Sequence, residues 1–246
     1  MSHDRGSSDD APPSATPMAP GRAPRAKGPE TPRTAQELVD ELVGLYRDQV
    51  RRALSSDLDD SETSLAFVDH HLSTAADEGR TPILSLLAAS AGAYYGELVR
   101  KLIGGTWIGD GKDPRRLRML MKYQFIYFSP IDQALEAIAG ESLELDDPRL
   151  QGADRFDPTF RLRPLPDPPE LADDDHDAVW LTERLSELPE VPESQYVSLT
   201  CRFETLKLMH EMLATKHASQ GRTPVTLGVE DYLEAIASEA RATRPD

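Results

Sequence analysis

Residues 81–104 constrain the fold more than any other part of the chain. Their apolar residues repeat at helical spacing, and Ala88, Gly92 and Gly96 leave one side of the predicted helix almost without side chains. A glycine inside a helix costs roughly 1 kcal/mol relative to alanine. We therefore expect another segment to pack very closely along this stripe and to offset the cost.

The hydrophobic period changes from 3.6 to 2 just after this helix. Gly104 stands where a left-handed residue ends a helix, and apolar residues then alternate over 116–127, which predicts one long strand. Residues 106–108 would pair with that strand as an antiparallel hairpin. Ser129 and Pro130 give a helix start signal directly after it.

The remaining ordered segments have helical patterns. We predict helices that begin at Thr34 and near residue 61, one long helix over about 194–219, and a last helix over 229–240. The sequence thus predicts an α+β fold that is mostly α-helical, with a small antiparallel β-hairpin.

The chain divides into four parts by composition. Residues 1–33 hold seven prolines and almost nothing to bury, which predicts a disordered Pro-rich arm. Residues 34–140 form the main helical domain with the hairpin. Residues 141–175 carry eleven acidic side chains and six prolines, which is typical of a linker. We expect residues 176–246 to form a helical half that packs on the main domain, since so few residues bury little core alone.

Two short segments suggest a degenerate internal duplication. IDQALEAIAGE at 131–141 aligns without gaps to VEDYLEAIASE at 229–239, with six identities in eleven positions. Each segment follows a long apolar helix and an extended stretch. The alternative is that LEAIA is simply good helix composition.

The charge and cysteine content limit the function classes. The net charge is −16 and no region is basic, whereas nucleic-acid binding depends on cations that neutralise phosphates. We therefore expect no nucleic-acid partner, although Arg115, Arg116, Arg118 and Lys122 form a local basic set. The single cysteine, Cys201, and the lack of a signal-peptide pattern or a long apolar run predict a cytoplasmic protein without a membrane partner. The excess of arginine over lysine favours a bacterial origin.

The glycines at 104–111 do not form a phosphate-binding loop. That loop requires G-x-x-x-x-G-K-[ST], but Thr106 stands at its first glycine and Asp113 at its hydroxyl position. Such loops also run from strand to helix, and this one runs from helix to strand. We interpret these glycines as a helix stop and a hairpin turn.

The histidine patterns do not predict a metal site. The run MHEM at 209–212 has Ala214 where the second histidine of a zinc-protease helix would stand. His210 and His217 can share a helix face, but no further ligand lies near them in the sequence. The histidines of the D-H-H run at 69–71 point about 100° apart around a helix. We expect no metal and no cofactor.

One polar cluster lies beside the glycine stripe, and it comprises Tyr94, Glu97, Arg100 and Trp107. A buried structural ion pair and a functional site both fit Glu97 and Arg100 at i,i+3 spacing. The succession Y-x-G-E-x-x-R-x-x-x-G-G-x-W that contains them resembles a signature of an uncharacterised bacterial family of domains of unknown function. The resemblance covers about residues 58–140 and implies a fold but no activity.

These observations favour binding over catalysis. No catalytic constellation is complete, and acidity combined with long linkers is typical of proteins that order on a partner. We predict a cytoplasmic, non-enzymatic regulator that binds, escorts or inhibits another protein. The alternative is an enzyme of unrecognised type with its site around Tyr94, Glu97 and Arg100, which requires these side chains to line an open pocket.

Overall fold

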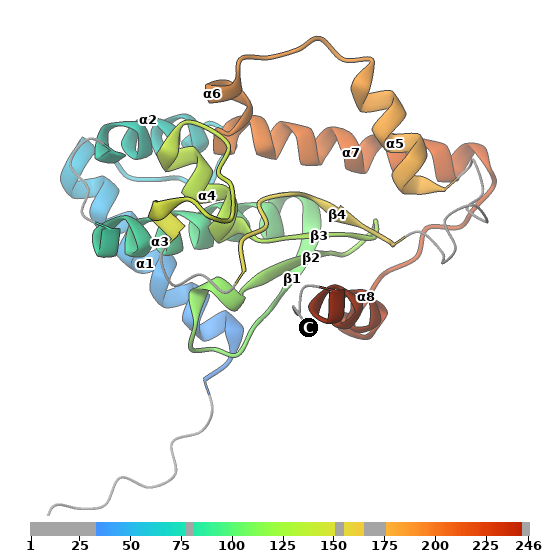
Figure 1. Cartoon of the computed structure of the whole chain (residues 1–246), viewed down its shortest axis with the longest axis horizontal. Helices are drawn as coiled ribbons and strands as arrows, with labels where there is room; N and C mark the ends of the chain where they lie inside the picture. The colour runs from blue at the N-terminus through green and yellow to red at the C-terminus, as the bar shows by residue number, and fades with distance from the viewer. Residues whose placement is uncertain (1–32, 77–80, 151–154, 165–175, 243–246) are drawn as a thin grey trace, which may run out of the picture. The chain divides into compact units, whose positions relative to one another are not determined.

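The structure is a computed structural model that describes residues 33–76, 81–150, 155–164 and 176–242. The predicted arm, apart from its last residue, and residues 151–154 and 165–175 of the predicted linker lie outside these ranges. The described chain has a mostly helical α+β fold with one four-stranded antiparallel sheet (Figure 1). The predicted fold class is confirmed, and the sheet is larger than the predicted hairpin.

Three helices open the described chain: α1 (Ala35–Leu54), α2 (Ser64–Ala76) and α3 (Thr81–Val99). The predicted capping box starts α1, because Thr34 Oγ1 accepts a hydrogen bond from the Glu37 N–H (3.2 Å) and the Glu37 carboxylate accepts one from the Thr34 N–H (2.7 Å). After α3 the chain makes a π-helical turn (Arg100–Gly104). The helix ends at Gly104, where φ is 105°.

The glycine stripe of α3 packs against two neighbours. A Cβ atom placed at Gly92 would lie 2.6 Å from the carbonyl oxygen of Pro130, the first residue of α4 (Pro130–Ala139). A Cβ atom at Gly96 would lie 2.4 Å from the Trp107 ring. The prediction of very close packing along this stripe is confirmed, since any side chain at either position would overlap its neighbour.

The sheet is an antiparallel meander of four short strands in sequence order. They are β1 (Gly105–Ile108), β2 (Arg118–Met121), β3 (Ile126–Phe128) and β4 (Arg161–Leu162). Trp107 lies opposite Met119, and Met119 lies opposite Phe128. Strand β4 pairs with β3 although it belongs to the segment predicted as a linker.

The single strand predicted over 116–127 is wrong, because residues 122–125 turn the chain between β2 and β3. This turn contains no glycine or proline and keeps the alternation of apolar residues, so the sequence pattern runs straight through it. Its ends are held from α8 (Val229–Ala242), where the Tyr232 hydroxyl donates to the carbonyl oxygens of Met121 (2.7 Å) and Gln124 (2.9 Å). A contact more than 100 residues away in the sequence therefore helps to fix the turn.

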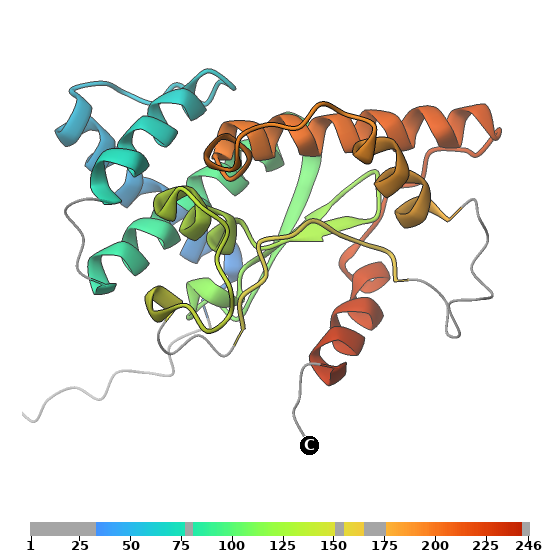
Figure 2. The ribbon, with the colours of Figure 1, turned by 45° about the horizontal axis from the view of Figure 1, so that its top comes forward.

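The two faces of the sheet pack against different parts of the chain. One face joins the main core through Met119, Met121, Ile126 and Phe128. The other face is covered by α8, where Leu120 and Tyr127 meet Tyr232 and Ala235. Figure 2 shows α8 on the side of the sheet opposite α7 (Leu199–Ser219). Burial on both faces explains why the strand pattern lacks a consistent polar side.

The helix predicted over 194–219 is interrupted. The short α6 (Glu193–Tyr196) ends before Ser198, whose backbone is extended and whose Oγ accepts the Cys201 N–H (3.2 Å) at the start of α7. Asp69 of α2 adds a second cap, because its carboxylate accepts the N–H groups of Leu199 (2.8 Å) and Thr200 (3.0 Å). This tertiary cap gives the aspartate of the D-H-H run a structural role.

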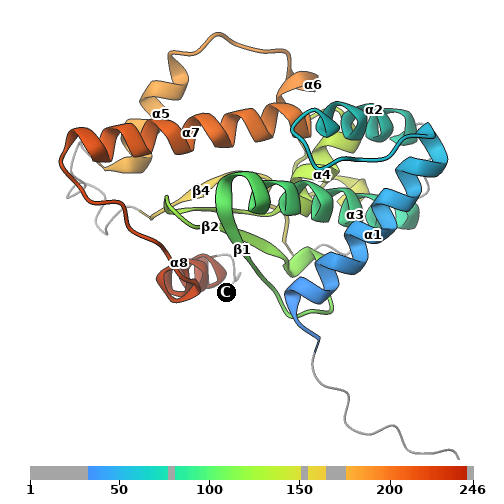
Figure 3. The same cartoon turned by 180° about the vertical axis from the view of Figure 1, so that it is seen from behind.

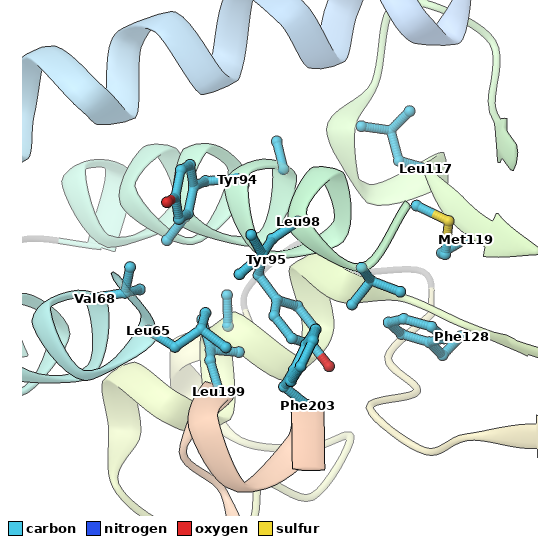
Figure 4. Packing of buried hydrophobic residues seen from close by; sticks show 14 of the residues in the cluster. Leu65, Val68, Tyr94, Tyr95, Leu98, Leu117, Met119, Phe128, Leu199 and Phe203 are labelled. Carbon is cyan, nitrogen blue, oxygen red and sulfur yellow. The ribbon is translucent and has the colours of Figure 1, made fainter. Parts of the chain in front are cut away.

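Helix α7 runs along one side of the molecule, and α5 (Asp177–Ser186) packs on its C-terminal half (Figure 3). Its first turns enter the main core, where Leu199 and Phe203 approach Leu65 of α2 and Tyr95 of α3 (Figure 4). None of the helices in the described part of the chain combines the length and the hydropathy that crossing a bilayer requires.

The two segments of the suggested duplication pack in different surroundings. Helix α4 lies in the main core against α3 and α2, whereas α8 covers the outer face of the sheet. A β-strand leads into α4, but an irregular segment, residues 220–228, leads into α8. The duplication stays a hypothesis.

Candidate functional site

Three of the four residues of the predicted polar cluster are joined by hydrogen bonds. The Arg100 guanidinium donates two hydrogen bonds of 2.8 Å to the Glu97 carboxylate, and Trp107 Nε1 donates a third of 3.4 Å. Burial raises the pKa of Glu97, but these donors outweigh it and the pKa lies below its ordinary value. Tyr94 lies apart from them, with its ring 5.8 Å from that of Tyr46.

Most of this cluster is buried. Tyr94 is 1% exposed, Glu97 7% and Trp107 6%, and only Arg100 reaches solvent substantially. The Glu97 carboxylate holds the Trp107 ring against Gly96, where α3 has no side chain of its own. The arrangement favours a structural role, because a catalytic group must reach a substrate.

A second buried ion pair was not predicted. Arg202 of α7 pairs with Glu136 of α4, and both side chains are about 5% exposed or less. Arg202 Nη1 and Gln133 Nε2 each donate to the carbonyl oxygen of Pro158 at 2.9 Å. These bonds fasten α4, α7 and the chain before β4 together at the N-terminal end of α7.

Two members of the predicted basic set contact neighbouring backbone or acids. The Arg118 guanidinium donates to the carbonyl oxygens of Arg115 (2.8 Å) and Leu117 (2.9 Å), and Arg116 lies 3.6 Å from Asp110. These contacts give Arg116 and Arg118 a local structural role.

Two hollows flank the C-terminal half of α7. One is a cavity of about 420 Å³ bounded by α7, the 122–125 turn and the segment between α7 and α8. The other, called here the α5–α7 groove, has a volume of about 570 Å³ and is lined by Trp180, Leu208 and Met212, among others. The residues of the predicted polar cluster line neither of them.

Asp177, the first residue of α5, links the two hollows. Its carboxylate accepts hydrogen bonds from Lys216 Nζ (3.1 Å), which lines the groove, and from His217 Nε2 (2.9 Å), which lines the cavity. Burial raises the pKa of Asp177, but the bonds from His217 and Lys216 outweigh it, so the pKa lies below its ordinary value. The carboxylate is therefore charged at neutral pH, and Lys216 is its ion-pair partner.

His210 and His217 both line the cavity, as their spacing of seven residues allows. Burial lowers the pKa of His210, so the imidazole is neutral at pH 7. Its Nε2 is buried and has no hydrogen-bond partner among the described residues. Over the ranges that the structure describes, no three His, Cys, Asp or Glu side chains are grouped so that they could hold a metal ion.

One local sequence pattern indicated the cavity, and the rest of its lining has no such pattern. The i,i+7 histidines on a long helix marked one wall of the cavity. Arg163, Asp177 and Arg222 come from three separate segments, and no local pattern connects them to the histidines. The cavity could therefore not be predicted before the chain path was known.

Comparison with known proteins supplies no family. No protein-family model, no curated protein and no solved structure matches this chain. The resemblance of residues 58–140 to an uncharacterised bacterial family stays a prediction.

Proposed function

We propose that this protein is a non-enzymatic regulator that binds another protein through the α5–α7 groove. The observation that carries the proposal is the groove itself, a hollow of about 570 Å³ with Trp180, Leu208 and Met212 among its lining. Grooves of this kind bind the apolar face of an amphipathic helix. The burial of the Tyr94, Glu97 and Trp107 cluster also supports binding over the enzyme alternative.

The charge beside the groove favours a basic partner helix. Helical spacing places Glu183 and Glu187 on the face of α5 that carries Trp180. Glu204 shares a face of α7 with Glu211, which lines the groove. All four glutamates are exposed, and the whole chain carries a net charge of −16. Complementary charge accelerates association and suppresses wrong partners.

The exposed cations of the same two helices cancel only part of this charge. Arg184 Nη1 lies 2.9 Å from a Glu187 carboxylate oxygen, and Lys207 Nζ lies 3.1 Å from Glu62 of α2 and 3.9 Å from Glu204. Glu183 and Glu211 have no ion pair with a lysine or arginine among the described residues. An amphipathic helix with lysine or arginine along its edges therefore fits the groove best.

Affinity capture with matched variants tests the proposal. The tagged protein would be incubated with an extract of its own organism beside Met212→Glu in the groove, Thr215→Arg on the groove rim and Leu233→Glu on the exposed side of α8. We expect the wild type and L233E to capture the same stoichiometric partner, and M212E and T215R to lose it. Thermal melting of each variant verifies its fold.

The partner's contact segment is then identified by photo-crosslinking. A benzophenone amino acid at position 211 lies in the groove and should link to a helical, basic segment of the partner. Absence of a stoichiometric partner, or retention of the partner by a folded T215R variant, would contradict the proposal.

A further inference from the structure

We propose that the cavity on the other side of α7 is a binding site for a small organic acid with a flat aromatic body. The cavity of about 420 Å³ falls within the volume range typical of small-molecule sites. Its residues differ from those of the α5–α7 groove, so this site does not depend on partner binding.

The apolar part of the site consists of aromatic and aliphatic side chains, a kind that folded proteins usually bury. Tyr123 and Phe125 of the turn, with Val225 and Leu227 of the segment before α8, line the cavity. Tyr123 is 44% exposed and Val225 64% exposed. Aromatic and aliphatic side chains grouped around a hollow are typical of ligand sites, because a ligand removes their surface from water.

The polar part of the site is positively charged within an acidic protein. Arg163 lies 4.7 Å over the Phe125 ring, and no acidic side chain among the described residues pairs with it. The one lining carboxylate, Asp177, is paired with Lys216 and accepts a hydrogen bond from His217. An anion is therefore the ligand charge that this lining stabilises.

Two features favour a carboxylate on a planar body. The Arg163 guanidinium can bind a carboxylate through two parallel N–H groups, a geometry that a compact ammonium group does not offer. The other face of the Phe125 ring stacks on Tyr232, with 4.2 Å between ring centroids, so a planar ligand can lie against the exposed Tyr123 ring while its carboxylate reaches Arg163.

His210 forms part of the α7 wall of the cavity. Its ring meets Tyr123 edge to face, with 6.1 Å between the ring centroids, and its buried Nε2 has no hydrogen-bond partner within the described part of the chain. Because burial lowers the pKa of His210, the imidazole is neutral at pH 7 and does not oppose an anionic or a neutral ligand.

Fluorescence titration of the full-length protein tests this site. The probes are 1-anilinonaphthalene-8-sulfonate as the reporter, indole-3-acetate as a planar carboxylate, and indole-3-acetamide as its neutral counterpart. We expect saturable binding of the reporter at one site. Indole-3-acetate should displace the reporter at a concentration at least about tenfold lower than indole-3-acetamide does, which is the effect of one charged hydrogen bond.

Three variants localise the site. Ala214→Trp places a large ring in the cavity from an exposed position of α7 and should abolish reporter binding. Arg163→Gln should weaken displacement by indole-3-acetate about tenfold and leave displacement by the amide unchanged. Arg52→Gln removes an exposed arginine on α1 and should bind both compounds as the wild type does.

Equal displacement by acid and amide, or wild-type binding by folded A214W and R163Q, would overturn the proposed site. Capture of the protein partner is measured for the same variants in a separate experiment. If A214W still captures the partner, its groove is intact, and a loss of reporter binding in that variant is due to the cavity alone.

Discussion

The two ends of α7 lie in different surroundings. At the N-terminal end, Asp69 caps the helix from α2 and Arg202 forms a buried pair with Glu136 of α4. At the C-terminal end, the helix lies between a cavity and a groove, and α5 is the helix packed against it. The difference separates two parts of one helix: its first half is built into the core, and its second half borders the two hollows that we propose as recognition sites.

The largest effect is expected from removing one partner of the buried ion pair. Arg202→Ala leaves the Glu136 carboxylate buried and removes a hydrogen bond to the Pro158 carbonyl. We expect a loss of about 3 to 5 kcal/mol in the free energy of unfolding, measured by urea denaturation. The control is the double variant Arg202→Met with Glu136→Met, which should recover most of that loss. Equal losses in both would show that the charge pair is not the cause.

A pH-dependent effect is expected at Asp132 of α4, next to this pair. Burial raises the pKa of Asp132 to about 6, against the opposing effects of Arg118, the Asp157 N–H and Ser129. Because the folded protein then binds a proton more tightly than the unfolded chain, this group adds stability as pH falls from about 6 to 4.

Asp132→Asn removes that dependence. The free energy of unfolding of the variant relative to the wild type should be greater at pH 7 than at pH 4 by about 2 to 3 kcal/mol. Parallel pH profiles of the two proteins would mean that the Asp132 carboxyl titrates normally in the folded state.

The close packing of α3 on α4 gives the next prediction. Gly92→Ala places a Cβ atom 2.6 Å from the Pro130 carbonyl oxygen, so the backbone must shift. We expect a loss of about 1 to 3 kcal/mol despite the better helix propensity of alanine. Gly44→Ala on α1 is the matched control, since nothing lies within 4 Å of its new Cβ, and it should raise stability by up to about 1 kcal/mol. Stabilisation by both substitutions would contradict the close approach.

The smallest effects compare one contact at each end of α7. Asp69→Ala removes the tertiary cap from the Leu199 and Thr200 N–H groups and should cost about 1 to 2 kcal/mol. His217→Ala removes a hydrogen bond to Asp177 between two partly exposed side chains and should cost less than about 1 kcal/mol. Denaturation of both variants under one condition measures the difference, and a greater loss at His217 would reverse the assignment of the two ends.

The sequence predicted the parts of the fold that local patterns specify. The Gly92 and Gly96 stripe indicated close packing, and the Thr34 and Glu37 pair indicated a helix start, because each pattern lies within one element. The turn at 122–125 was missed because a tyrosine on a distant helix holds it. The break at Ser198 was missed because apolar residues keep helical spacing across it, and half of its cap comes from Asp69.

The candidate site was harder to predict than the fold. Spacing placed Tyr94, Glu97, Arg100 and Trp107 in one predicted cluster, but only the structure shows that Tyr94 lies apart and that Glu97 and Trp107 are buried. The cavity joins residues from the chain just after β4, the 122–125 turn, the start of α5, α7 and the segment before α8. Two histidines at i,i+7 were its only local signal, since Arg163 and Arg222 have no shared sequence pattern.

Amide chemical shifts offer the most direct test of the assignment of recognition to the C-terminal half of α7. Indole-3-acetate would be titrated into the isotope-labelled full-length protein and the shifts followed by NMR. We predict changes in residues 123–125, 163 and 210–227, and none in residues 199–206 or in the Tyr94, Glu97 and Trp107 cluster. Changes centred on that cluster or on the first turns of α7 would contradict the account.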